Sequence, residues 1–162
     1  MTYTAWSDGS FMKEGEAYIA YIIIDSRNRV VKRKKARVDG VNTSYESELA
    51  ALYYLFKEIS EKKIKNINIH TDCLSLYHNL KKKRENQTDL NKMMEKVLGK
   101  REKKRLIKSL SWESRAKNLA HFLFNSEKET GHITNFIEEF GHLEKTSKRY
   151  RRKNRDEYQK KM

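Results

Sequence analysis

The sequence of 162 residues contains no proline, six glycines and a single cysteine. The lone Cys73 excludes a disulfide framework within the chain and suits a reducing compartment, so we expect a cytoplasmic protein. No apolar run reaches the roughly 18 residues that a membrane span needs, and we expect neither a membrane segment nor a signal peptide. Because proline and glycine are scarce, there is no obvious linker, and the length fits one domain with a core of ordinary size.

Positive charge is abundant and unevenly distributed. The 36 Lys and Arg residues outnumber the 22 Asp and Glu residues, for a formal net charge of +14. Residues 1–80 hold 12 basic against 10 acidic residues, whereas residues 81–162 hold 24 against 12. Most of the excess lies in three runs, at residues 81–84, 100–105 and 148–155. Such an excess indicates a polyanionic partner, and the alternative is a charge that serves only solubility.

The first half of the chain has the patterns of strands around one helix. Residues 3–8 alternate as in a strand that Gly9 breaks, residues 17–24 are almost continuously apolar, and residues 30–38 form a basic strand suited to an edge. Thr43 and Glu46 have the spacing of a capping box, which predicts that a helix begins there. Residues 64–72 read as a fourth strand, and the intervening helix implies a crossover connection and a mixed sheet.

The second half is mainly helical. We expect helices over residues 74–80 and 89–98, a fifth strand over residues 105–112, and helices over residues 116–126 and 133–143. Beyond residue 144 core-forming residues are few, and the tail is either a solvated helix or a basic arm. The predicted order is β-β-β-α-β-α-α-β-α followed by C-terminal helical additions, which is an α/β architecture.

Three carboxylates lie at element ends in this prediction. Asp8 ends the first strand, Asp72 ends the fourth, and Glu48 lies early in the helix between them. If the two strands are parallel neighbours, both Asp side chains project from the same end of the sheet. Three converging carboxylates repel one another unless a cation lies between them, and oxygen ligands suit Mg²⁺ or Mn²⁺. Each residue alone could instead be a turn or helix-cap residue.

Three short motifs resemble those of the ribonuclease H family, type 1: Ser7-Asp8-Gly9-Ser10, Thr43 with Glu48-Leu49-Ala50-Ala51-Leu52, and Ile69-His70-Thr71-Asp72-Cys73. Weaker similarities are Ser111-Trp112 and Ala120 to Leu123. The resemblance covers residues 1–126. It implies a five-stranded mixed sheet, with antiparallel strands 1–3 and parallel strands 4 and 5, flanked by helices. It also implies cleavage of the RNA strand of an RNA/DNA hybrid by two metal ions, Mg²⁺ or Mn²⁺, at least one of them bound only with substrate.

The resemblance also assigns roles to residues. Asp8 would bridge both ions, Glu48 and Asp72 would each ligate one ion or orient water, and Thr43 would hold a phosphate. The family's fourth acid is replaced by His121, whose neutral imidazole would bind Mg²⁺ more weakly and Mn²⁺ relatively better. The predicted substrate-binding residues are Gly9, Ser10, Thr43, Ser44, Cys73, Lys81, Lys82, Lys83 and Arg84. Residues 81–105 would be a basic protrusion that holds the DNA strand, and residues 127–162 a basic helical extension.

Other positions depart from the family pattern. An asparagine expected before the fourth acid is one residue out of register, with Lys117 in its place and Asn118 following. The loop at residues 11–16 is short, and Ser44 and Tyr45 stand where asparagines usually follow Thr43. We therefore keep two alternatives to a hybrid-cleaving monomer: a non-catalytic nucleic-acid-binding protein on the same fold, and a nuclease with a different nucleic-acid substrate.

Overall fold

The computed structural model describes residues 1–82, 89–126 and 131–141. Its strands are β1 (Tyr3–Lys13), β2 (Glu16–Asp25), β3 (Val30–Asp39), β4 (Ile67–Thr71), β5 (Leu110–Trp112) and β6 (Gly131–Ile133). Its helices are α1 (Ser44–Glu61), α2 (Leu74–Lys81), α3 (Asp89–Leu98), α4 (Lys100–Lys108), the short 3-10 helix η1 (Arg115–Lys117), α5 (Leu119–Ser126) and α6 (Phe136–Phe140). No helix in these ranges has the length and apolarity of a membrane span.

One mixed sheet organises the described part of the chain. Its order is β5-β4-β1-β2-β3-β6. The pairs β1–β2 and β2–β3 are antiparallel, whereas β1–β4 and β4–β5 are parallel. The predicted mixed α/β fold with antiparallel strands 1–3 and parallel strands 4 and 5 is therefore confirmed. A sixth strand, β6, adds in parallel to the free edge of β3.

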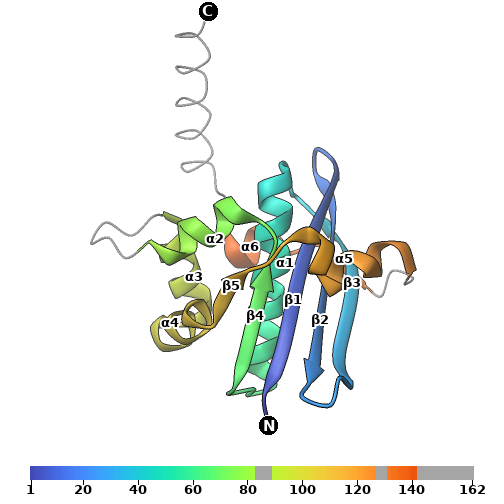
Figure 1. Ribbon diagram of the computed structural model, residues 1–162. Helices are drawn as coiled ribbons and strands as arrows, with labels where there is room; N and C mark the ends of the chain where they lie inside the picture. Colours follow the sequence, from blue (N-terminus) through green and yellow to red (C-terminus); the bar gives the residue numbers. More distant parts are fainter. Residues whose placement is uncertain (83–88, 127–130, 142–162) are drawn as a thin grey trace, which may run out of the picture.

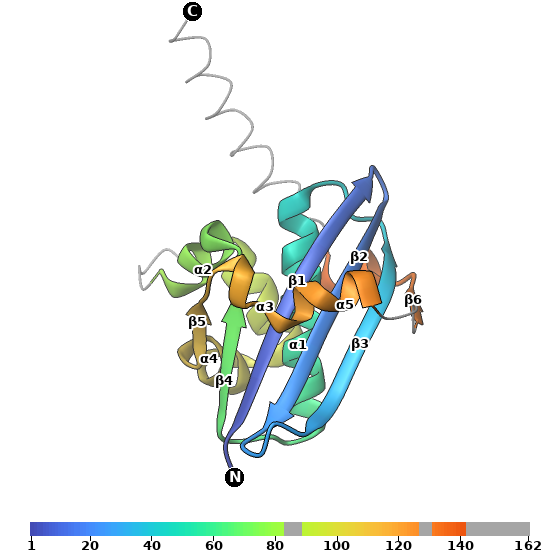
Figure 2. The same ribbon diagram turned by 45° about the vertical axis from the view of Figure 1, so that its right-hand side comes forward.

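The two faces of the sheet carry different helices. Alternate residues of a strand point to opposite faces, and Ala5 on β1 packs with α1 in the main core, whereas its neighbour Trp6 packs with Ala120 and Leu123 of α5. Figures 1 and 2 show α1 behind the sheet and α5 crossing in front of β1 and β2. The helix α1 buries a broad apolar stripe, including the fully buried Tyr53 and Phe56, and provides the largest share of the core.

Three predicted boundaries in the second half of the chain are wrong, each for a physical reason. Residues 105–108 belong to α4 and not to a strand. A short apolar run fits the period of a strand as well as that of a helix. In the structure the buried residues are Lys103 and Leu106, which are three positions apart, as on one face of a helix. The helix predicted from residue 133 begins at Phe136, because Gly131–Ile133 pairs with β3. The helix predicted from residue 116 begins at Leu119 after η1.

Gly9 does not break β1. The strand continues to Lys13 because it stays paired with β2, whereas its pairing with β4 stops at Ser7 and Thr71. Glycine is needed at position 9 for another reason. A Cβ atom there would lie 2.3 Å from the backbone carbon of Ser47 and 2.6 Å from the backbone nitrogen of Glu48. The strand therefore touches the first turns of α1 directly.

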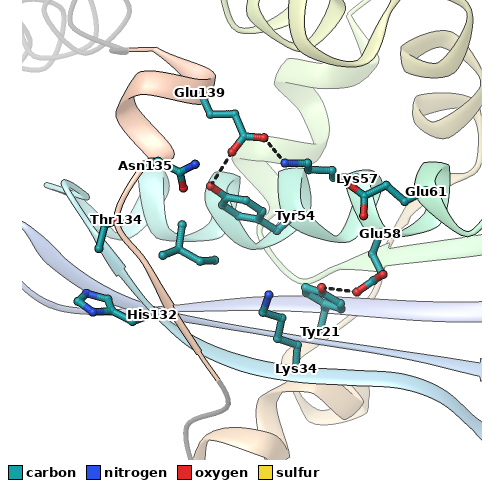
Figure 3. Close-up of a pocket in the computed structure, with 11 residues that line it drawn as sticks. Tyr21, Lys34, Tyr54, Lys57, Glu58, Glu61, His132, Thr134, Asn135 and Glu139 are labelled. Atoms are coloured by element: carbon teal, nitrogen blue, oxygen red, sulfur yellow. Dashed lines mark hydrogen bonds and ion pairs between the residues drawn. The ribbon is translucent and has the colours of Figure 1, made fainter.

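The described part of the predicted C-terminal extension packs on α1 and the sheet edge. Glu139 on α6 accepts hydrogen bonds from Tyr53 (2.7 Å) and Tyr54 (3.3 Å) and forms an ion pair with Lys57. A cavity of about 430 Å³ opens beside this contact, between α1, β3 and the segment that leads into α6 (Figure 3). None of the three predicted catalytic carboxylates lines it, so we regard it as a packing feature of α6.

The contact at Gly9 generates the first prediction. We expect Gly9→Ala to lower the free energy of unfolding by about 1–3 kcal/mol, because a backbone segment must move to admit the methyl group. Urea unfolding followed by circular dichroism measures this. Gly131→Ala is the matched control, since a Cβ there meets only ordinary contacts at 3.7 Å and beyond. Equal stability of the two variants would show that β1 does not press on α1.

Candidate functional site

The parallel pairing of β1 and β4 brings Asp8 and Asp72 together. Tyr3 to Ser7 pair in register with Ile67 to Thr71, so Asp8 and Asp72 are the next residues at the same end of both strands. Asp8 is not a strand end, contrary to the prediction, but it lies where the β4 pairing ends. Glu48 reaches the same place from the second turn of α1. One carboxylate oxygen from each of the three residues lies within 4.8 Å of the others.

The electrostatics of this cluster are those of three crowded anions. Burial and the neighbouring Asp8 and Asp72 carboxylates raise the pKa of Glu48 well above its ordinary value. Burial and Asp8 also raise the pKa of Asp72. The Oε2 atom of Glu48 is buried and has no hydrogen-bond partner among the residues that the structure describes. A buried, unpaired acceptor among three carboxylate oxygens fits a divalent cation with oxygen ligands, such as Mg²⁺ or Mn²⁺.

His121 joins the site through Asp8. Its Nδ1 atom lies 2.9 Å from Oδ2 of Asp8, and the guanidinium of Arg115 lies 3.5 Å from the same Nδ1 atom. His121 is not among the residues whose ligand atoms all converge within 4.8 Å. The structure thus places His121 beside the trio as a hydrogen-bond partner of Asp8. Its predicted role as a metal ligand stays a prediction.

Asn118 is a site residue that the sequence pattern did not identify as one. It is buried, and its Nδ2 atom donates to the backbone oxygen of Ser7 (2.9 Å) and to Oδ2 of Asp72 (3.1 Å). Its Oδ1 atom accepts from the backbone nitrogen of Ala120 (3.0 Å) and so caps α5. Although it is one residue out of the family's register, it links β1, Asp72 and α5. The feature of the sequence that could have identified Asn118 is its position three residues before His121.

The backbone beside Asp72 is held by two further contacts. The indole nitrogen of Trp112 donates to the backbone oxygen of Asp72 (3.1 Å). The hydroxyl of Thr71 accepts from the backbone nitrogen of Cys73 (3.2 Å), at the start of α2. A bond from the neighbouring strand β5 and a bond to the last residue of β4 therefore fix the turn that presents the Asp72 carboxylate.

The remaining predicted residues lie at varying positions around the trio. Thr43 caps α1, its Oγ1 atom accepting from the backbone nitrogen of Glu46 (3.0 Å). Gly9 and Cys73 are the chain neighbours of Asp8 and Asp72, and Ser10 and Ser44 follow Gly9 and Thr43. Lys81 and Lys82 lie at the far end of α2, about 12 Å of helix beyond its first residue. Lys83 and Arg84 lie outside the described residues, as does the predicted tail from residue 142.

The raised pKa of Glu48 has a consequence for stability. In the unfolded chain the pKa of Glu48 returns to about 4.5. Between this value and the folded-state pKa, the folded protein holds a proton that the unfolded chain has released. The free energy of unfolding of the metal-free protein therefore falls as the pH rises through this window.

We expect Glu48→Gln to raise the free energy of unfolding of the metal-free protein at about pH 8 by on the order of 1 kcal/mol, because the amide is neutral in both states and folding no longer requires the uptake of a proton. The variant should also show a smaller decline in the free energy of unfolding between about pH 5 and pH 8. Thermal unfolding in a chelating buffer measures both effects. Glu14→Gln, at an exposed turn, serves as the control. A destabilised Glu48→Gln protein with an unchanged pH profile would contradict the crowding of these carboxylates.

Comparison with solved structures finds the same fold in ribonucleases H. Ribonuclease H1 from the archaeon Halobacterium salinarum is 13% identical, with a TM-score of 0.55 over 74% of this chain and 91% of that chain. LC11-RNase H1, solved in complex with an RNA/DNA hybrid, is 15% identical, with a TM-score of 0.57 over 73% of this chain and 89% of its own. The N-terminal ribonuclease H domain of a Mycobacterium tuberculosis protein is 17% identical, with a TM-score of 0.52, covering 72% and 85%.

Comparison at the level of sequence gives the family. No curated protein matches the chain significantly. The family model described as "Reverse transcriptase-like" matches residues 6–119, which is more than half of the chain and includes Asp8, Glu48 and Asp72. The chain therefore belongs to the reverse transcriptase-like family, and the ribonuclease H family that its motifs predict is confirmed.

Proposed function

We propose that this protein is a metal-dependent endonuclease that cleaves the RNA strand of RNA/DNA hybrids. The convergence of Asp8, Glu48 and Asp72 within 4.8 Å, at the end of two parallel strands of a ribonuclease H fold, carries the proposal. Two similar structures, LC11-RNase H1 and a foamy viral protease-reverse transcriptase, were solved in complex with an RNA/DNA hybrid. The net charge of +14 supports a nucleic-acid substrate.

The chain's own residues would create and orient the metal site. Asp8, Glu48 and Asp72 would hold the cations, and the buried Oε2 atom of Glu48 is a ready acceptor. Divalent cations bound there would supply Lewis-acid activation of water and of a phosphate oxygen. The bond from Asn118 and the bond to its backbone from Trp112 fix the Asp72 carboxylate. Pre-orientation of this kind lowers the cost of assembling the site when metal and substrate arrive.

His121 would orient Asp8. With Nδ1 donating its proton to Asp8, a neutral ring leaves Nε2 as an acceptor for water or for a metal ion. A histidine adds no negative charge at this position, so the site holds three formal carboxylates and would favour Mn²⁺ relative to Mg²⁺. This substitution is also the observation that favours the alternative of a non-catalytic nucleic-acid-binding protein.

We expect Asp8→Asn to abolish cleavage of a labelled RNA/DNA hybrid in both Mg²⁺ and Mn²⁺, because it removes one of the three carboxylates that would hold the cations. The assay compares the wild-type protein and this variant on hybrid, duplex RNA and duplex DNA. Cleavage of hybrid alone by the wild type supports the proposal. Cleavage of duplex RNA or DNA would assign a different substrate, and binding of all three duplexes without any product would identify a non-catalytic protein.

We expect His121→Asp to increase the cleavage rate in Mg²⁺ more than in Mn²⁺, because it adds a hard anionic ligand beside Asp8. The ratio of rates in the two metals, measured at saturating concentrations of each, is the readout. His121→Asn is the matched control, since it keeps a neutral side chain. If His121→Asp and His121→Asn gave the same ratio, charge at this position would not control metal preference.

A further inference from the structure

Exposed apolar side chains gather beside the carboxylate cluster. Eight large hydrophobic side chains are exposed in the described part of the chain, and four of them belong to residues next to site residues: Leu74, Trp112, Leu119 and Phe122. Trp112 and Phe122 are also the most exposed aromatic residues there, at 46% and 54%. Each of the four is beside a site residue in the chain or bonded to one, so these exposed side chains are candidates for contacts with a ligand of the site. A nucleotide suits such a site, because its phosphate can bind a metal ion held by the three carboxylates and its flat base can stack on an aromatic ring.

The two aromatic residues are linked to different carboxylates of the cluster. Trp112 ends β5 on the Asp72 side, where its indole nitrogen donates to the Asp72 backbone. Phe122 lies on α5 on the Asp8 side, with its ring 6.1 Å from the ring of His121. Figures 1 and 2 show β5 and α5 on opposite sides of the β4–β1 pair. The elements that carry Trp112 and Phe122 therefore lie on either side of this strand pair.

Basic residues lie between the two rings in the chain. Arg115 and Lys117 on η1 are exposed, and the guanidinium of Arg115 approaches His121 (3.5 Å). The buried Asn118 anchors this segment through its bonds to Ser7 and Asp72. Asn118 therefore holds the backbone of this segment beside the cluster. Exposed aromatic and basic side chains together are the composition of a surface that binds unpaired nucleotides.

We propose that residues 112–122 form a platform for unstacked nucleotides, so that the preferred substrate is a junction between an RNA/DNA hybrid and single-stranded RNA. Trp112 and Phe122 would stack on bases, and Arg115 and Lys117 would contact phosphates. In a continuous duplex the base faces are covered by neighbouring base pairs, whereas at a junction they are available. The inference rests on the proposed function and adds the form of nucleic acid that the site takes.

Binding by the Asp8→Asn protein, which keeps substrate intact, tests the platform. Fluorescence anisotropy compares a blunt RNA/DNA hybrid with the same hybrid carrying a single-stranded RNA extension. We expect tighter binding of the extended hybrid. Adding Phe122→Leu should weaken binding of the extended hybrid roughly tenfold and leave the blunt hybrid nearly unchanged, because stacking on one base is lost. Trp112→Leu, which loses both the ring and the bond to Asp72, should also weaken binding of the extended hybrid roughly tenfold. Trp112→Phe, which keeps an aromatic ring but not the bond to Asp72, should retain most of the preference.

Val31→Ala, an exposed apolar residue on β3, is the control and should bind like its parent. Tryptophan fluorescence gives an independent readout, since Trp112 is 46% exposed and Trp6 only 9%. The extended hybrid should shield Trp112 from acrylamide quenching more than the blunt hybrid does. Equal affinity for both hybrids, or Trp112→Leu and Phe122→Leu proteins that bind like the parent, would overturn the platform. Cleavage of the blunt hybrid by the wild-type protein tests the proposed function separately, so the two failures are distinguishable.

Discussion

The backbone of β1 meets the first turns of α1 at Gly9, and the position of all three carboxylates depends on this contact. A side chain at position 9 would enter the space of the Ser47 and Glu48 backbones. With glycine at position 9, Glu48 can approach Asp8, which is the preceding residue of β1. The register of β1 with β4 then adds Asp72 at the same end of the sheet. One close backbone approach and one parallel strand pair are enough to assemble the cluster.

This assembly opposes stability, and other contacts compensate for it. Burial and like charge raise the pKa of both Glu48 and Asp72, so the folded state carries an electrostatic cost when no cation is bound. Asn118 and His121 each give a hydrogen bond to a carboxylate of the trio. Both come from the segment at the start of α5, so a single short element stabilises two strands against each other. Functional sites that bring like charges together commonly lower the stability of the folded state.

The basic half of the chain also has a structural logic. Two acidic side chains of α3 and α4 pair within the domain: Glu95 pairs with the buried Lys103, and Glu102 pairs with Arg105 and accepts from Ser60. The bonds from Arg105 and Ser60 lower the pKa of Glu102 to about 2. These two acids therefore do not neutralise the exposed lysines of α4. Such a surface attracts phosphate backbones whatever the base sequence.

Local patterns in the sequence were sufficient for most elements. The capping box at Thr43, the apolar stripe of α1 and the alternation before Asp72 each depend on neighbouring residues only, and each corresponds to an observed element. Residues 105–108 were assigned to a strand because a short apolar run fits both periods, and only their packing as α4 distinguishes the two. Strand β6 could not be expected from Gly131–Ile133, because its edge pairing with β3 joins segments far apart in the chain.

For the candidate site, the sequence by itself was enough to select Asp8, Glu48 and Asp72, from their motifs and their places near element ends, and the structure brings these three carboxylates together. The tertiary structure decided how they are held. Asn118 lies one residue out of the expected register, yet its side chain reaches both Ser7 and Asp72. Trp112 and His121 likewise act on residues 40 and 113 positions away. Motif residues are identified by local spacing, whereas a hydrogen bond between distant residues exists only after the strands have paired and α5 has packed across them.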